Sequence, residues 1–253
     1  MNLLISLRAE LLKTKRTPAL YFTGLAALLI PLVFFIDVCT DGMEKENSLD
    51  PLNAFFREGA KGMGVFILPL FVILLCTLLA QIEYRNNTWK QLFASPQTGM
   101  QVYSAKFLNM QLLLLLFLLL YNGLMLLALA ALRVTVPVLE LGKYRLDWGS
   151  LLHINLNLYA SVLAISSIQF WISIRFRNFV VSAGVGIVLW LAACFILLEL
   201  HFTYANLYPY TLPVMSVFER YQPKLSSIQL TSVAYAVVFL LLGCLDFSRR
   251  SIR

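Results

Sequence analysis

The chain has 253 residues, of which 60% are hydrophobic and 13% charged, and its mean hydropathy is +0.78. Because soluble domains are about 45–50% apolar and about 25% charged, this composition excludes an ordinary soluble domain, a disordered tail and a disulfide-stapled secreted module. The net charge of +7 comes without basic runs interleaved with aromatic residues, so basic flanks of membrane spans explain it better than nucleic-acid binding does.

The first 17 residues are typical of an amphipathic helix on a membrane surface. Five leucines recur at helical spacing, at Leu3, Leu4, Leu7, Leu11 and Leu12. Basic residues at positions 8, 13, 15 and 16 would face the lipid headgroups, and Thr17–Pro18 separates the segment from the first span. The alternative is an ordinary positive flank of a signal anchor, which accounts for the charges but not for the leucine spacing.

Six windows contain no Asp, Glu, Lys or Arg and are long enough to cross a bilayer. They cover residues 19–36, 62–82, 107–132, 151–174, 178–198 and 225–245. Backbone polar groups must be satisfied internally in lipid, and these windows lack the alternation of a membrane barrel, so each is expected to be a helix. The predicted fold class is therefore all-α, a polytopic membrane protein with six transmembrane helices in one domain.

The distribution of Lys and Arg predicts the orientation. With the N-terminus inside, 12 of the basic residues fall on the inner side and eight on the outer side. This bias predicts that both termini are cytoplasmic.

Three connections between spans carry distinct signals. Residues 37–61 are rich in Asp and Glu and are expected to form a solvated outer loop. Residues 199–224 are rich in Tyr and Pro, which favours an outer interfacial or re-entrant element over a free loop.

The inner segment 83–106 is the most informative. Thr88 is a candidate cap of a short helix, with Trp89, Leu92 and Phe93 on one face, ended by Ser95–Pro96. Such a face either rests on the membrane or docks into a groove on a partner, and the residues alone do not separate the two readings.

Uncharged polar side chains occur inside the spans, at Gln111, Asn122, Asn157, Ser161, Ser166 and Gln169. They are candidates for lining a substrate pathway, and hydrogen bonds between helices are the competing explanation. Ser182, Gly184 and Gly186 of the fifth span are expected to allow close helix packing.

No catalytic, cofactor-binding or metal-ligating pattern is evident. The four cysteines and two histidines lack zinc spacing, and there is no G-x-x-x-x-G-K-[ST] phosphate loop. We therefore expect no enzyme activity, no metal and no cofactor of the chain's own.

The order of elements resembles the membrane-spanning permease subunit of type-2 ABC exporters, in particular permeases of lantibiotic and bacitracin self-protection systems. The resemblance covers nearly the whole chain and rests on the N-terminal helix, the six spans and the stretch from Glu83 to Lys106. That stretch is similar to the pattern E-x-x-x-G-T-W-x-x-L-x-x-x-P-x-x-x-x-x-x-Y-x-x-K of the family, with Asn87 in the place of the glycine.

The resemblance implies a multi-pass protein of the bacterial plasma (inner) membrane that exports a peptide-like or lipophilic compound. It implies three kinds of partner: a separate ABC ATPase that binds the ATP, a second permease chain and membrane lipid. Glu83, Thr88, Trp89, Leu92 and Phe93 would then lie at or beside the contact with the ATPase. The alternative is a membrane scaffold or sensor partner that transports nothing and recruits a cytoplasmic protein through residues 83–106.

Overall fold

The computed structural model describes residues 3–15, 17–40, 50–85, 98–136, 143–200 and 204–250. Within these ranges every regular element is a helix. The long helices are α1 (Leu3–Thr14), α2 (Pro18–Thr40), α3 (Pro51–Gly62), α4 (Leu68–Arg85), α6 (Gly99–Thr135), α7 (Trp148–Arg175), α8 (Phe179–Phe195) and α10 (Leu225–Arg250). The all-α prediction is confirmed.

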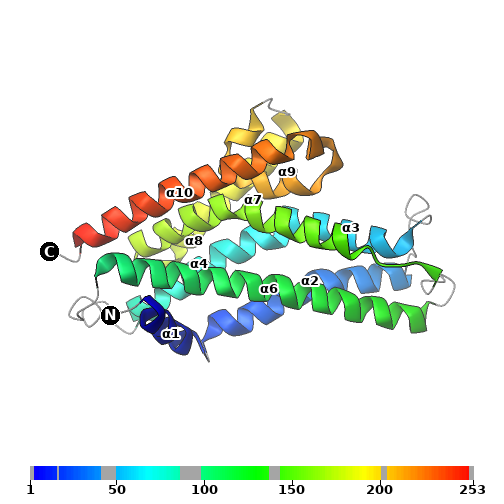
Figure 1. Cartoon of the computed structure of the whole chain (residues 1–253), viewed down its shortest axis with the longest axis horizontal. Coiled ribbons are helices and arrows are strands. Elements are labelled where there is room, and N and C mark those ends of the chain that lie inside the picture. The colour runs from blue at the N-terminus through cyan, green and yellow to red at the C-terminus, as the bar shows by residue number, and fades with distance from the viewer. Residues whose placement is uncertain are drawn as a thin grey trace.

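Six helical stretches are long and apolar enough to cross a membrane. They are Pro18–Thr40, Pro51–Arg85, Gly99–Thr135, Trp148–Arg175, Phe179–Glu199 and Glu219–Arg249. Each contains most or all of one predicted window, so the six-span prediction is confirmed. The helices lie side by side in a bundle, with α10 packed along α7 and α2 along α6 (Figure 1).

Both ends of the described chain lie at the same end of the bundle, with α1 and the last turns of α10 (Figure 1). We call this the termini end and the other the far end. The ends of α4 and α7 and the start of α6 and α8 also lie at the termini end, because successive spans alternate in direction. Which end faces the cytoplasm stays a prediction.

Side-chain caps fix where several helices begin. Thr98 accepts a hydrogen bond from the backbone N–H of Gln101, whose side chain accepts in return from the N–H of Thr98, and this capping box starts α6. The side chains of Asp147 and Asn178 accept hydrogen bonds from backbone N–H groups in the first turns of α7 and α8, respectively.

The expected outer loop 37–61 is partly wrong. Residues 51–62 form α3, which continues through a π-helical turn, Met63–Ile67, into α4. Leu52, Phe55 and Phe56 are buried on one face of α3, and the charged side chains lie on the other. Charged residues on one face of this segment mask the helical period of the apolar residues on the other. Residues 37–40 belong to α2, and residues 41–49 lie outside the described part.

The segment after α8 packs into the bundle. It forms a π-helical turn, Ile196–Leu200, then short helices at Ala205–Leu207, Pro209–Thr211, Leu212–Val217 (α9) and Glu219–Lys224. Tyr210 is 1% exposed, and Ser216 of α9 hydrogen bonds Ser161 of α7 at 3.1 Å. Residues 204–224 are therefore no free loop, whereas their depth in the membrane stays a prediction.

The predicted N-terminal helix exists as α1, and its polar side faces inward. Ser6, Glu10 and Thr14, spaced four residues apart, are buried against the bundle. Leu4 and Leu12 are 75% and 63% exposed. For a helix in contact with lipid this arrangement is stable, because the leucines remain in an apolar medium while Glu10 and Thr14 find partners inside the protein.

Candidate functional site

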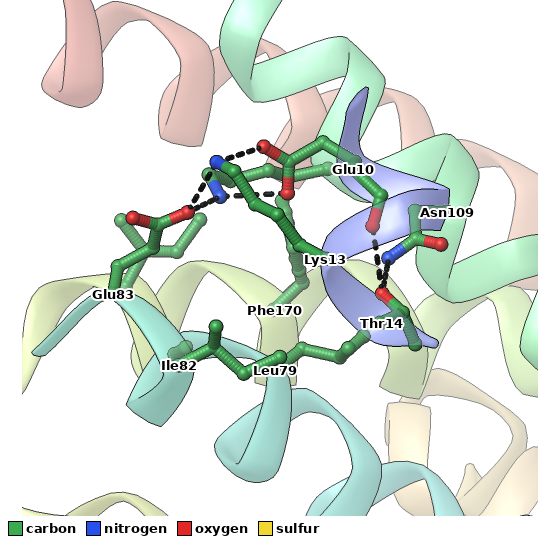
Figure 2. Close-up of a pocket in the computed structure, with 11 residues that line it drawn as sticks. Glu10, Lys13, Thr14, Leu79, Ile82, Glu83, Asn109 and Phe170 are labelled. Carbon is green, nitrogen blue, oxygen red and sulfur yellow. Dashed lines mark hydrogen bonds and ion pairs between the residues drawn. The ribbon is translucent and has the colours of Figure 1, made fainter. Parts of the chain in front are cut away.

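Four charged side chains from three helices meet at the termini end (Figure 2). Lys106 of α6 places its Nζ 2.6 Å from Oε1 of Glu83 on α4 and 2.8 Å from Oε2 of Glu10 on α1. Lys13 of α1 places its Nζ 2.8 Å from Oε1 of both glutamates. Each lysine thus bridges both carboxylates, and we call these four residues the charge cluster.

The cluster is buried and electrically balanced. The exposed side-chain fraction is 2% for Glu83, 9% for Lys106 and 12% for Glu10, whereas Lys13 at 37% closes the cluster on the outside. Two positive charges oppose two negative ones, and buried ions are tolerated only with such pairing. Burial alone lowers the pKa of Lys13, but its hydrogen bonds to Glu10 and Glu83 and their negative charges raise the pKa above its ordinary value.

Helix geometry explains how distant parts of the sequence come together here. Glu10 and Lys13 lie three residues apart on α1 and therefore on one face. Beside them Thr14 donates a hydrogen bond to the carbonyl of Glu10 and accepts one from Asn109 Nδ2 at 2.8 Å (Figure 2). These contacts dock α1 on α6 through polar groups.

A cavity of about 20 Å³ adjoins the cluster and is walled by Leu79, Ile82 and Phe170 (Figure 2). This volume is sufficient for one water molecule. The low-dielectric wall strengthens the ion pairs, because little solvent screens them.

The cluster joins the two ends of the connection between α4 and α6. Glu83 lies in the last turn of α4, just before the connection begins. Lys106 lies in the second turn of α6, the helix that Thr98 caps. Nearby, Tyr84 donates a hydrogen bond to the carbonyl of Ile174 at 2.5 Å and Gln81 donates one to the carbonyl of Arg177 at 2.9 Å. The end of α4 is thereby tied to α1, α6 and the end of α7.

The predicted coupling residues divide into two groups. Thr88, Trp89, Leu92 and Phe93 lie outside the described residues. Glu83, which the resemblance places at or beside the contact with the ATPase, is 1% exposed and pairs with Lys13 and Lys106 inside the protein. Glu83 therefore anchors the start of the connection, and its place beside an ATPase contact stays a prediction.

The six polar residues predicted as pathway candidates all hydrogen bond within this chain. Gln111 donates to Ser166 Oγ at 3.1 Å, and Gln169 donates to the carbonyl of Ser182 at 2.9 Å. The other three make the interhelical pairs Asn122–Asn155, Asn157–Gln229 and Ser161–Ser216. These contacts support the interpretation that they join helices.

Sequence reasoning did not single out Glu10, Lys13 or Lys106 as a site. The basic pattern of the first 17 residues places Lys13 at lipid headgroups, and Lys106 counts toward the orientation and closes the motif that begins at Glu83. A signal was present, because Glu10 interrupts a leucine-rich helix and Lys106 immediately precedes an apolar window. Their meeting depends on how α1 docks, which local patterns do not specify.

Comparison with known proteins agrees with this architecture. Residues 6–193 match the model of a protein family described as ABC-2 family transporter protein. The match spans well over half of the chain, from α1 to α8, and includes all four residues of the charge cluster. A search of curated proteins found no match.

The family and the six apolar helices identify a multi-pass protein of the bacterial inner membrane. Such a chain is the membrane-spanning component of a transporter and not its catalytic part. The chain belongs to the ABC-2 family of transporter proteins.

Proposed function

We propose that this permease subunit exports a peptide-like or lipophilic compound, such as an antimicrobial peptide, driven by a separate ABC ATPase. Two permease chains form the pathway in this proposal, and the ATPase binds to the α4–α6 connection. The termini end then faces the cytoplasm, in agreement with the charge bias of the sequence.

The charge cluster is the observation that carries the coupling part of the proposal. Glu83 and Lys106 flank the connection and lie 2.6 Å apart, and both also contact α1, through Lys13 and Glu10 respectively. A force applied to the connection therefore acts on α1, α4 and α6 together. This is the mechanical property that a transporter needs when nucleotide chemistry occurs in another subunit.

The uncharged character of the spans supports the substrate class. Described charged groups lie toward the ends of the bundle, in the charge cluster and in the Arg175–Asp246 pair at the termini end, and in α3 at the far end. The six polar residues predicted as pathway candidates carry no charge, and each is hydrogen-bonded within this chain. A pathway between two such chains has apolar walls, which suit an amphipathic or lipophilic compound better than an inorganic ion.

Co-purification tests the coupling. The wild-type chain is expressed with the ATPase encoded beside it and compared with Trp89→Ala/Phe93→Ala. A matched control, Trp148→Ala/Tyr204→Ala, removes two exposed aromatic side chains at the far end. We expect the wild type and the control to retain an ATP-hydrolysing complex and the first variant to lose it at equal membrane levels.

Failure of the wild type to bind any ATPase contradicts the transport mechanism and favours the scaffold alternative. Equal loss in both double variants contradicts the placement of the contact. The substrate part is tested separately, by asking whether cells that carry both subunits tolerate more of an amphipathic antimicrobial peptide than cells in which the ATPase cannot hydrolyse ATP.

A further inference from the structure

A groove of about 600 Å³ runs between α7 and α10 at the termini end. The two helices pack along each other (Figure 1), and the groove is lined by residues at their last turns. None of the residues of the charge cluster lines it.

The walls of the groove are apolar and face outward. Phe176 of α7 and Leu242 and Leu245 of α10 are 42%, 46% and 55% exposed. Leu242 and Leu245 belong to a helix that is long and apolar enough to cross a bilayer, and Phe176 adjoins another. The apolar part of the groove is therefore suited to acyl chains.

The end of the groove is polar and carries an excess of positive charge. Asp246 accepts a hydrogen bond from Trp171 Nε1 at 3.2 Å and from Arg175 Nη1 at 3.3 Å. Arg249 lies three residues after Asp246, on the same face of α10, and also lines the groove. The described lining of the groove thus contains two arginines and one carboxylate.

The chemistry of these groups selects an anion. The Arg175 side chain is 53% exposed and donates a hydrogen bond to Asp246. A guanidinium group carries five N–H donors, so Arg175 has capacity for a further acceptor. A guanidinium group binds phosphate oxygens through two parallel N–H donors. Trp171 is half-buried, and its indole N–H donates to Asp246. Tryptophan favours the boundary between hydrocarbon and headgroups.

We infer that the α7–α10 groove binds an anionic phospholipid of the surrounding membrane. Arg175 and Arg249 hold the phosphate of the headgroup, and the acyl chains lie along Phe176, Leu242 and Leu245. A soluble phosphate compound would use the arginines but leave the apolar walls uncovered, so the geometry favours a lipid. Basic pockets between transmembrane helices bind anionic headgroups in this manner.

Native mass spectrometry of the full chain tests the site. Protein in mild detergent is titrated with dioleoyl phosphatidylglycerol, with dioleoyl phosphatidylcholine, or with glycerol phosphate as a competitor without acyl chains. The test variant is Arg175→Gln/Arg249→Gln. The matched control, Arg133→Gln/Arg220→Gln, removes the same charge from two exposed arginines at the far end.

We expect the wild type and the control to retain phosphatidylglycerol in preference to phosphatidylcholine, and the test variant to bind it more than about tenfold more weakly. Asp246→Asn is a second variant, and its expected effect is a gain of binding, which a folding defect would not produce. It removes the only described negative charge in the groove, so retention of phosphatidylglycerol should increase.

Any of the following results overturns the inference: equal retention of the two lipids by the wild type, equal weakening in the control, or no gain in Asp246→Asn. Displacement of the bound lipid by glycerol phosphate alone also overturns it, because the ligand is then a soluble anion.

Discussion

Lys106 Nζ lies 2.6 Å from Glu83 Oε1, although the whole α4–α6 connection separates the two residues along the chain. Both side chains are almost completely buried, at 9% and 2% exposed. Removing one member of a buried ion pair leaves an uncompensated charge, which typically costs about 3–5 kcal/mol.

We therefore expect Lys106→Met to lower the free energy of unfolding by about 3–5 kcal/mol, and Glu83→Gln to lower it comparably. The double variant should lose clearly less than the sum, since it removes one charge of each sign. Denaturant unfolding of the wild type and the three variants in one detergent measures the four free energies of this double-mutant cycle. Additive losses would show that the two residues do not interact as the structure describes.

The raised pKa of Lys13 predicts a pH dependence of stability. A lysine whose folded pKa is raised contributes stability that is complete below its unfolded pKa, about 10.4, and is lost as the pH rises through the higher folded pKa. Lys13→Arg keeps the charge throughout this range. The melting temperature of the wild type is therefore compared with that of Lys13→Arg at each pH. The difference between them should be constant from about pH 7 to 9.5 and should fall above about pH 10.5. A difference that stays constant to about pH 11.5 would contradict the charged partnership of Lys13.

Two glycines of α8 provide a matched pair for packing. A Cβ at Gly186 would lie 2.6 Å from Gln169 Oε1 and 2.8 Å from Ile73 Cγ2, whereas a Cβ at Gly184 has nothing within 4 Å. Gly186→Ala should lower the melting temperature with a cost of about 1–3 kcal/mol, because Gln169 must give up its hydrogen bonds. Gly184→Ala should be neutral or stabilising by up to about 1 kcal/mol. The same loss for both would indicate that α8 does not pack as described.

Asn122 and Asn155 form a reciprocal amide pair between α6 and α7. Each Nδ2 donates to the Oδ1 of the other, at 2.7 and 3.1 Å. If the pair is structural, Asn122→Leu and Asn155→Leu should each destabilise the chain. The double variant should lose about 0.6–2 kcal/mol less than the sum of the two single losses, and this difference is the coupling energy of the pair. ATPase stimulation by substrate in the assembled transporter should change little for the double variant, and its loss would favour the pathway interpretation of Asn122.

Local sequence patterns were enough for the architecture. The six uncharged windows predicted the spans, since nothing but helices satisfies the backbone in lipid at that composition. They failed for residues 51–62, where charges on one face of α3 hid the apolar period of Leu52, Phe55 and Phe56. The leucine spacing of the first 17 residues predicted α1, but not that its polar face would be buried.

The sequence by itself determined that the protein lies in a lipid bilayer. Its apolar content and the length of each window require a bilayer and six helices. Only the tertiary structure decided which polar groups meet. It placed Glu10, Lys13, Glu83 and Lys106 in one cluster and gave Gln111 and Gln169 partners on other helices. The physical reason is that burying a charge or an amide is stable only with a partner, and the partner is chosen by how helices pack, which residues close in sequence do not encode.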